Sequence, residues 1–348
     1  MAVAKTIFGK TPEGKEVELY TITNKNGMSA EVITFGAILK SLYVPDKKGK
    51  VKDVVLGYDK LWMYLKNGSF FGATVGPSAN RIGGASYVVD GKKVQLPVND
   101  HKLNNLHSDK DNGFHKRLWK AEAGKNSVTF TLSKKDKDLG PGNATFSVTY
   151  TLTDANELKI AYHATSDKKT LINMTNHSYF NLQGPESMSM EDTVLMINSS
   201  KFTETDRALI PTGKFIDVDG TPMDFRKPKK IGRDIGKIEY KPLKICGGYD
   251  HNYVIDGWNG KKKLIAVAEE KKSGRKMEVY SDLPGVQFYA GNFIAENIGK
   301  EGYKNCRRKG FCLETQYYPD TPNHEEFPQA FFGAGRDYDT TTIYKFSW

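Results

Sequence analysis

The sequence is poor in cysteine. Its 348 residues contain only Cys246, Cys306 and Cys312, and no two of them form a CxxC pair. An odd number of cysteines cannot all pair within one chain, and the lack of CxxC argues against a zinc ribbon. We therefore expect three reduced thiols with structural roles.

Long apolar runs are missing as well. Hydrophobic residues make up 38% of the chain, which is enough for a sizeable core, but no stretch approaches the roughly 18 residues of a membrane-spanning helix. Residues 1–10 alternate small and charged side chains, without the apolar segment of about 7 to 15 residues that a secretory signal requires. These absences predict a globular, cytoplasmic protein that does not associate with a membrane.

Acidic residues are too few to balance the basic ones, and the net charge is +10. A nucleic-acid surface would favour a basic stripe on one element with aromatic residues interleaved. The lysines instead cluster beside Gly, Pro and Asp, which indicates solvated turns and no nucleic-acid partner. The clusters are residues 47–48, 134–137, 227–230, 261–263 and 307–309.

Alternation of apolar and polar residues predicts strands through most of the chain. The Asp90–Gly91 pair lies between two such stretches and is a strong hairpin signal. One of few helical signals starts at Asp59 as N-cap, places Leu61, Trp62 and Leu65 on one face, and stops at Gly68. The predicted strands include residues 19–23, 32–44, 54–56, 128–132, 146–152 and 158–162.

The order of these elements predicts the fold class. No alternation of strands with long helices appears, so we expect an all-β protein, a large antiparallel β-sandwich with a few short helices. Length alone would favour two domains. No linker or break in composition divides the chain, however, so residues 1–348 are expected to form a single domain.

Three of the seven histidines lie in loops or at strand ends, namely His107, His177 and His251. His177 belongs to residues 175–182, where polar groups gather among aromatics just after an apolar run. A hydrogen-bonded packing role is the commoner fate of a lone histidine. His163 has the opposite phase to Tyr162 and should face solvent. The chain has no HExxH motif, and His107 with His115 lacks familiar ligand spacing, so no metal is expected.

Glu314 differs from the other acids because it lies in a segment that otherwise resembles a buried strand. Burial of a lone carboxylate costs several kcal/mol unless it is paired or hydrogen-bonded. The two interpretations are an ion pair with Arg307 or Arg308, and a general base held in a pocket. Asp250 is a second acid of this kind. Asn80 and Arg81 form a glycine-flanked donor pair that suits sugar hydroxyls as well as a structural turn.

Several motifs resemble the galactose mutarotase family, also called aldose 1-epimerases. They occur in the family's order and cover essentially the whole chain, which implies one large β-sandwich with a sugar site on its concave face. The motifs are GATVGPSANRIGGA (72–85), NNLHSDKDNGFHKRLW (104–119), NMTNHSYFNL (173–182), LIPTGKF with GTPMDFR (209–226), GGYDHNYV (247–254), PGVQFYAGNF (284–293) and FCLETQYYPD (311–320).

The resemblance assigns roles residue by residue. It makes His177 the general acid and Glu314 the general base, with His107 as the second active-site histidine that stabilises charge on the ring oxygen. Apart from the resemblance, Asn176 and Ser178 are expected to orient His177 as its neighbours in the chain. The remaining expectations are that Asn80, Arg81, Asp250 and Gln287 bind sugar hydroxyls, and that Tyr179, Phe180 or Phe288 offers a stacking face.

The implied activity is the interconversion of α and β anomers of a free aldohexose such as galactose or glucose, without a cofactor, by a monomer or a homodimer. Two loops depart from the family pattern, at Pro77 and Ser78 and at Ser108 and Asp109, which affects the expected efficiency and substrate preference. Three alternatives stay open. They are a glycoside hydrolase using Asp250 and Glu314, a hexose-phosphate epimerase, and a noncatalytic carbohydrate-binding protein.

Overall fold

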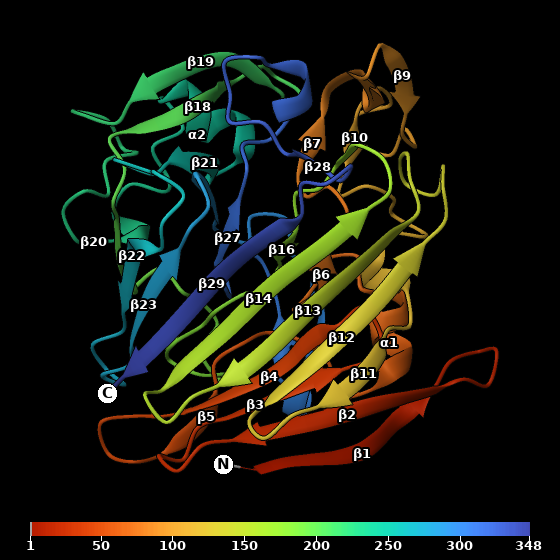
Figure 1. Ribbon diagram of the computed structural model, residues 1–348. Coiled ribbons are helices and arrows are strands. Elements are labelled where there is room, and N and C mark those ends of the chain that lie inside the picture. Colours follow the sequence, from red (N-terminus) through yellow and green to blue (C-terminus); the bar gives the residue numbers. More distant parts are fainter. Residues whose placement is uncertain (1) are drawn as a thin grey trace.

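The computed structural model describes residues 2–348 as three main antiparallel sheets joined by two-stranded pieces (Figure 1). The first sheet is a meander of consecutive strands at the N-terminal end of the chain. Its strands, in spatial order, are β1 (Ala2–Lys10), β2 (Glu16–Thr23), β3 (Ser29–Ile33), β4 (Ile38–Pro45) and β5 (Val51–Asp53).

The second sheet is the largest and contains the C-terminal strand in its interior. Its long strands run diagonally across the front of Figure 1. In spatial order they are β11 (Lys120–Ala123), β12 (Ser127–Lys134), β13 (Ala144–Leu152), β14 (Glu157–Ser166), β29 (Tyr338–Ser347), β23 (Lys276–Ser281), β22 (Lys263–Glu269), β17 (Val194–Ile197) and β20 (Lys229–Lys230).

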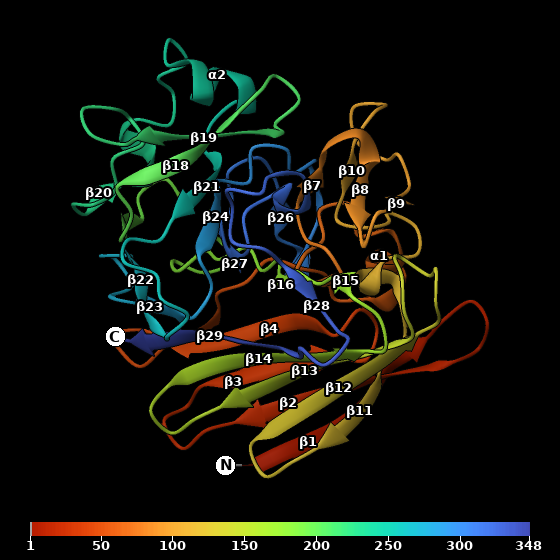
Figure 2. The same ribbon diagram turned by 45° about the horizontal axis from the view of Figure 1, so that its top comes forward.

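The third sheet lies toward the other end of the molecule, away from β1 and β2 (Figure 2). Its order is β19 (Pro211–Asp217), β18 (Lys201–Thr205), β21 (Asp250–Val254), β24 (Gly285–Tyr289) and β27 (Cys312–Gln316). The two-stranded pieces are β10 (Asn105–Leu106) with β7 (Arg81–Ile82), β15 (Thr170–Leu171) with β28 (Phe331–Phe332), β16 (Thr175–Asn176) with β6 (Thr74–Val75), β25 (Asn297–Ile298) with β26 (Lys304–Asn305), and β8 (Ser86–Val89) with β9 (Lys92–Gln95).

Helices are short, and the two α-helices are α1 (Leu61–Lys66) and α2 (Lys241–Cys246). Single 3₁₀ turns cover Gly83–Ala85, Phe114–Lys116, Ile231–Arg233, Lys300–Gly302 and Thr321–Asn323. Among residues 2–348, no helix has the length and apolar character needed to cross a bilayer.

The first two sheets pack face to face, with β2 and β3 against β12 and β13. Alternation along these strands supplies the contact, as in the edge-on pair of Tyr20 and Phe130, whose ring centroids lie 6.3 Å apart. One cluster of buried hydrophobic side chains includes residues from Tyr20 in β2 to Phe346 in β29. The expected all-β sandwich is therefore the observed architecture.

Several local predictions are confirmed. The alternating segments 19–23, 128–132, 146–152 and 158–162 lie in β2, β12, β13 and β14. Asp90 and Gly91 have φ of 50° and 73° and join β8 to β9, as a two-residue hairpin turn requires. His163 is exposed, and its Nδ1 lies 2.8 Å from an Asp339 carboxylate oxygen.

The prediction of one strand over residues 32–44 is wrong, because the chain turns between β3 and β4. Gly36 has φ of 66°, and a Cβ at this position would lie 2.6 Å from the carbonyl oxygen of His115. This close approach needs a glycine and breaks the strand. The strand expected at 54–56 is also displaced, since β5 ends at Asp53.

The predicted short helix exists, but two of its details are wrong. Its N-cap is Lys60, while the Asp59 carboxylate accepts a hydrogen bond from the Glu301 amide. The buried residues of α1 are Leu61 and Tyr64, three positions apart. Trp62 is 61% exposed, since adjacent helical positions do not share a face.

Three lysines from the predicted solvated clusters are buried, namely Lys134, Lys229 and Lys309. Each ammonium group donates to backbone carbonyl oxygens. Lys134 Nζ, for example, lies 3.0 Å from Gly140 O and 2.7 Å from Gly142 O. Turn carbonyls that accept from the ammonium group offset the cost of its burial, although burial lowers the pKa of Lys134.

Arg275 joins the sheets near the segment that carries His177. Its side chain is fully buried, and its guanidinium donates to the carbonyl oxygens of Val44, Pro45, Leu182 and Lys50 at 3.0 to 3.2 Å. A planar guanidinium can satisfy several carbonyls at once, and no apolar side chain can.

Replacing Arg275 with methionine is expected to lower the free energy of unfolding by about 3 to 5 kcal/mol, because it leaves buried carbonyls unpaired. Urea denaturation followed by circular dichroism measures the change. The matched control is Lys276→Met next to it, where a half-exposed ion pair with Glu278 should contribute less than about 1 kcal/mol. A loss below about 1 kcal/mol for Arg275→Met would contradict the role of the guanidinium.

Candidate active site

One face of the third sheet collects the polar side chains of β21, β24 and β27. The register sets Asn252 opposite Gln287 and Gln287 opposite Glu314. Side chains of directly opposed residues lie on the same face, and residues two apart along a strand share that face. Asp250 therefore lies on the same side as Gln287 and Glu314, while the intervening Tyr253, Phe288 and Leu313 enter the hydrophobic core.

His177 reaches this face from β16, which contacts β27. Its backbone is fixed on both sides, because its N–H donates to Ala73 O and its carbonyl accepts from the Gly72 amide. Gly72 has φ of 66°, and a Cβ there would lie 2.0 Å from Leu39 O. Only glycine permits the chain to run this close to β4 while supporting His177.

Asn176 and Ser178 support the same backbone segment. Ser178 Oγ donates to Asn176 Oδ1 at 2.6 Å, and Asn176 Nδ2 donates to Gly72 O at 3.0 Å. Neither side chain has a hydrogen bond to the His177 ring among the described residues. Their contacts hold the strand from which His177 projects.

Asn80 lies immediately before β7 and His107 immediately after its partner strand β10, and hydrogen bonds join the two residues. The His107 amide donates to Asn80 O at 3.0 Å, and the Asn80 amide donates to His107 Nδ1 at 3.1 Å. Asn80 and His107 have φ of 61° and 56°, uncommon values for residues other than glycine. These bonds set the direction of the His107 ring.

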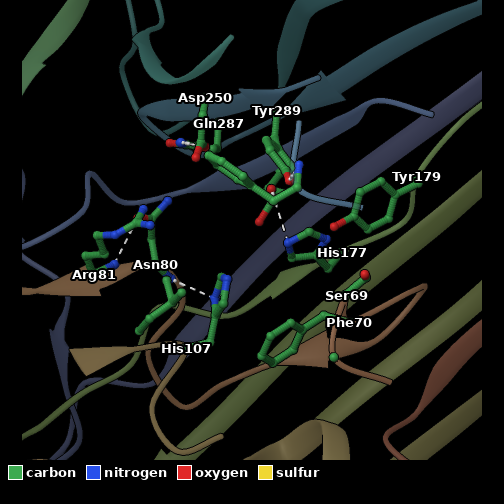
Figure 3. A pocket seen from close by; sticks show the side chains of 14 residues that line it. Ser69, Phe70, Asn80, Arg81, His107, His177, Tyr179, Asp250, Gln287 and Tyr289 are labelled. Carbon is green, nitrogen blue, oxygen red and sulfur yellow. Dashed lines mark hydrogen bonds and ion pairs between the residues drawn. The ribbon is translucent and has the colours of Figure 1, made fainter. Parts of the chain in front are cut away.

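All seven residues predicted for the site line one pocket, which encloses about 640 Å³ including its open mouth. Figure 3 shows His107, His177, Asn80, Arg81, Asp250 and Gln287 around the cavity, with Tyr179 and Tyr289 on the side of His177. The complete lining is Gly68, Ser69, Phe70, Asn80, Arg81, Leu106, His107, His177, Tyr179, Asp250, Gln287, Tyr289, Phe293 and Glu314.

His177 and Glu314 are each other's nearest charge partners. His177 Nε2 lies 3.7 Å from Glu314 Oε1, and both side chains are almost fully buried. Arg307 and Arg308 instead bond Gly247 O, and Arg308 also pairs with Glu191. The structural interpretation of Glu314, an ion pair with one of these arginines, is therefore wrong.

Burial shifts the two groups in opposite directions. It lowers the pKa of His177 to about 4. It raises the pKa of Glu314 well above its usual value, and the nearby Asp250 charge adds to this. Desolvation thus favours the uncharged form of each group, while attraction across 3.7 Å favours the charged pair. Because the two groups lie this close, their titrations are coupled.

The ligand atoms of His107, His177 and Glu314 lie within 4.8 Å of one another, so these three residues could be considered as a metal site. The His107 tautomer works against it. Because Nδ1 accepts the Asn80 amide proton, the neutral ring carries its own proton on Nε2 and presents N–H where a metal would need a lone pair. Burial lowers the pKa of His107 well below its usual value, and repulsion from His177 and Arg81 lowers it further.

A chain of side-chain amides links the residues predicted to bind hydroxyls. Asn80 Nδ2 donates to Gln316 Oε1 at 3.5 Å, Gln316 Nε2 to Gln287 Oε1 at 3.3 Å, and Gln287 Nε2 to Asp250 Oδ1 at 2.7 Å. Every donor points toward the Asp250 carboxylate. Such head-to-tail chains polarise one another and fix the orientation of each amide.

Arg81 is the one cationic side chain among the described residues that line the pocket. Its Nε donates to Asp100 Oδ2 at 3.1 Å, and both side chains are nearly buried. The guanidinium charge is therefore largely neutralised, while its remaining N–H groups stay available as donors.

Phe70 also lines the pocket, although the sequence did not predict it. Its ring centroid lies 4.8 Å from that of His107, 4.4 Å from His115 and 5.9 Å from His177. It has φ of 57°, a strained value for an aromatic residue. No periodic pattern marks such a residue, because Phe70 follows a helix stop in an irregular loop.

Tyr179 lines the pocket, as predicted for a stacking face, whereas Phe180 and Phe288 are fully buried in the core. Tyr289 and Phe293 also line the pocket and were not singled out from the sequence. Phe293 is 65% exposed. The aromatic residues that line the cavity are thus Phe70, Tyr179, Tyr289 and Phe293.

The two loops that depart from the family pattern contact each other. Ser108 Oγ donates to Ser78 O at 2.8 Å and accepts from the Ser78 amide at 2.9 Å. Ser108 has φ of 68°, so a side chain is held where glycine would be unstrained. Hydrogen bonds of the serine hydroxyl offset that strain and tie the His107 loop to the loop that precedes Asn80.

The cavity therefore combines an acid–base pair with amide, guanidinium and aromatic groups. Amides and carboxylates recognise hydroxyls, and aromatic faces pack on sugar rings. A histidine and a glutamate 3.7 Å apart in a pocket are groups of the kind that general acid–base chemistry uses. Together with the β-sandwich, this defines a carbohydrate-directed acid–base enzyme.

Comparison with known proteins agrees with this class. Residues 18–345 match the family model described as Aldose 1-epimerase. The chain is 39% identical to the galactose mutarotase of Rattus norvegicus, covering 100% of this chain and 99% of that protein. It is 35% identical to the aldose 1-epimerase of Escherichia coli (strain K12), over 96% of both chains. The chain belongs to the aldose 1-epimerase family.

A solved structure shares the fold at similar length. The crystal structure of the GalM/aldose epimerase homologue from C. elegans superposes with a TM-score of 0.86 at 32% sequence identity, and the match covers 94% of this chain and 98% of that one. The architecture described above is therefore that of the family.

Proposed function

We propose that the chain catalyses the interconversion of the α and β anomers of free aldohexoses such as galactose and glucose. The observation that carries the proposal is the buried contact of 3.7 Å between His177 Nε2 and Glu314 Oε1 at the base of a pocket lined by hydrogen-bonding groups. The names of the relatives, galactose mutarotase and aldose 1-epimerase, support the same reaction.

The reaction needs two proton transfers. Glu314 removes the proton of the anomeric hydroxyl while His177 protonates the ring oxygen, so that the bond between C1 and the ring oxygen breaks and an aldehyde forms. Rotation about the C1–C2 bond presents the other carbonyl face, and the reverse transfers close the ring. All atoms and electrons balance within the sugar and the pair, so no cofactor is needed.

Substrate binding places the proton where the reaction requires it. Burial favours uncharged His177 and Glu314, but an anomeric hydroxyl that donates to the carboxylate favours its charged form. The proton that Glu314 gives up then passes to His177, whose Nε2 lies 3.7 Å away. His107 Nε2–H provides a second donor for charge on the ring oxygen.

The remaining hydroxyls are held by the amide chain. Asp250 accepts hydrogen bonds from sugar hydroxyls, and Arg81 and Asn80 donate to them. The hydrogen bond from Gln287 to Asp250 fixes the orientation of both side chains toward the sugar. Holding these hydroxyls keeps the open-chain sugar in place while its C1–C2 bond rotates.

The pocket disfavours the alternatives. A hexose phosphate would need a free cation, but Arg81 is paired with Asp100, and the described lining contains no lysine. A glycoside hydrolase would use two carboxyl groups as its working pair, but the nearest charge partner of Glu314 is His177. A noncatalytic binding protein has no need for a buried histidine–glutamate pair.

The pH dependence of kcat/KM should lack a step at the usual histidine pKa of about 6.5. Burial lowers the pKa of His177 to about 4, so no separate histidine titration falls near neutral pH. We therefore expect a level profile between about pH 5.5 and pH 7.5 and a decline toward pH 4, where the protonation state of His177 changes. Polarimetric rates corrected for buffer catalysis measure it. An inflection at about 6.5 would contradict the burial of His177 in the working enzyme.

Polarimetry on freshly dissolved α-galactose and α-glucose, and on the corresponding 6-phosphates, tests the proposed activity. The expected result is a faster approach to an unchanged final rotation for the free sugars and little acceleration for the phosphates. Acceleration confined to the phosphates would favour the hexose-phosphate alternative. An unaltered rate for all four sugars would rule out the proposed reaction.

We also propose that residues 1–348 form one domain and that the protein acts in the cytoplasm. The hydrophobic cluster that includes side chains from all three main sheets supports the first. The three cysteines are all free thiols, which supports a reducing compartment.

A further inference from the structure

Gln316 is buried next to the pocket but does not line it. Its side chain is fully buried, and it is not among the described residues that surround the cavity. Gln316 follows Glu314 by two positions in β27, so both side chains project from the same face of that strand. Gln316 therefore lies close to the groups that face the sugar without being open to the sugar itself.

The two ends of the amide chain fix the direction of its members. At one end, Asn80 Oδ1 accepts the backbone N–H of Arg81 at 2.8 Å, so Asn80 Nδ2 faces Gln316. At the other end, Gln287 Nε2 donates to Asp250 Oδ1 at 2.7 Å, so Gln287 Oε1 faces Gln316. Burial, with a smaller contribution from a nearby acid, raises the pKa of Asp250, whereas the Arg81 charge and the Gln287 hydrogen bond favour its ionised, accepting form. Gln316 thus meets a donor on one side and an acceptor on the other.

The amide of Gln316 matches both neighbours. Its Oε1 accepts from Asn80 Nδ2 at 3.5 Å. Its Nε2 donates to Gln287 Oε1 at 3.3 Å and to Asn252 Oδ1 at 3.1 Å, which uses both of its N–H groups. Turning this amide by 180° would set donor against donor on one side and acceptor against acceptor on the other, in a buried place where unpaired polar groups are costly.

We infer that Gln316 is a positioning residue for sugar binding, which holds the amides of Asn80 and Gln287 so that the remaining N–H of each serves the pocket as a donor. Asp250 then serves as the acceptor of the same wall. Both amides line the pocket, and their carbonyl oxygens are already occupied by the Arg81 backbone N–H and by Gln316 Nε2. The inference rests on the proposed function, because it takes a sugar as the ligand of these groups.

A wall with this pattern distinguishes hydroxyls that accept from hydroxyls that donate. Fluorine in place of a hydroxyl group keeps a weak acceptor but has no proton to give. Fluorine should therefore be better tolerated than hydrogen at hydroxyls that face Asn80 and Gln287. It should be no better than hydrogen at a hydroxyl that faces Asp250.

Binding of 1-deoxygalactose and of its single fluoro and deoxy analogues to the wild-type protein tests the pattern by isothermal titration calorimetry. This sugar has no anomeric hydroxyl and cannot open its ring, so a failure here is distinct from a failure of the proposed reaction. We expect at least one position where the fluoro analogue binds about threefold or more tighter than the deoxy analogue, and one where it does not. Fluorine no better than hydrogen at every position, or no binding of 1-deoxygalactose, would overturn the inference.

Gln316→Met removes the amide and keeps the length of the side chain. It should raise KM for galactose and Kd for 1-deoxygalactose by about tenfold with kcat within about threefold, because Asn80 and Gln287 lose their fixed orientation while the acid–base pair is unchanged. An unchanged KM, or a loss confined to kcat, would overturn the positioning role. If Gln316→Met does not fold, the wild-type ligand series decides the question.

Gln329→Met is the matched control for this substitution. The Gln329 amide donates to the backbone carbonyl oxygens of Thr321, His324 and Phe327 at 2.7 to 3.1 Å, and Gln329 is not among the described residues that line the pocket. KM and Kd should stay within about twofold of the wild type. A tenfold rise in this variant as well would show that loss of any structural amide weakens binding, against a specific role of Gln316.

A double-mutant cycle shows whether Gln316 acts through Gln287. In a Gln287→Met background, Gln316→Met should raise KM by less than about threefold, because one of the amides that it orients is absent. The full effect of about tenfold in that background would mean that the two residues act independently, and would overturn the inference.

Discussion

Replacing Glu314 with glutamine is expected to lower kcat for mutarotation by at least about a hundredfold. The amide keeps the size of the carboxyl group but cannot accept the proton of the anomeric hydroxyl. It also removes the group that burial makes costly to charge, so folding should be maintained. Stopped-flow polarimetry with α-galactose measures kcat, and thermal unfolding checks the fold.

Glu278→Gln is the matched control for this change. Glu278 lies in β23 and pairs with Lys276 at the surface, away from the pocket lining. Its kcat should equal that of the wild type within about twofold. Near-normal turnover in Glu314→Gln, with the control also normal, would remove Glu314 from the mechanism.

Replacing His177 with asparagine should lower kcat by a similar factor of at least about a hundred, because no group then protonates the ring oxygen. Asparagine retains polar contacts with the pocket but does not titrate. The loss should fall mainly on kcat, since Asn80, Arg81, Asp250 and Gln287 still bind the hydroxyls.

The exposed His163 provides the comparison, since His163→Asn alters a surface contact with Asp339 only. Its activity should be unchanged. If His177→Asn raises KM but leaves kcat unchanged, His177 would be a binding residue, and His107 would be the remaining candidate acid in the pocket.

The alternation of apolar and polar residues predicted many strands of the sandwich, because a strand with one buried face must alternate in this way. The segments that became β12, β13 and β14 show it clearly, and Asp90 with Gly91 could be read from turn chemistry alone. The break at Gly36 was not visible, because its cause is a distant carbonyl, that of His115. Local sequence does not contain such contacts.

The candidate site was predictable where a residue type was unusual for its surroundings. Glu314 in an apolar strand and His177 among aromatics stand out in the sequence, and the resemblance connected them. The contact of Cys312 with His177 and the place of Phe70 in the pocket could not be predicted. A buried cysteine and an aromatic residue are ordinary core components, and only the 3.5 Å sulfur–nitrogen contact and the positive φ of Phe70 distinguish them.

The same limit applies to the buried lysines and to Arg275. Charged residues beside turns are usually solvated, and no pattern in the chain marks Lys134 or Arg275 as exceptions. Their burial depends on carbonyl groups that several loops bring together after folding. Such groups are recognised only when the tertiary contacts are known.

Magnetisation exchange between the anomeric protons of galactose at equilibrium tests the central claim most directly. No net reaction occurs, so the ¹H NMR exchange rate reports ring opening and closure alone. Wild-type protein should produce exchange between the α and β resonances in proportion to its concentration, and Glu314→Gln should reduce it at least about a hundredfold. Absence of exchange with the wild type, or equal exchange with the variant, would contradict an acid–base pair of His177 and Glu314.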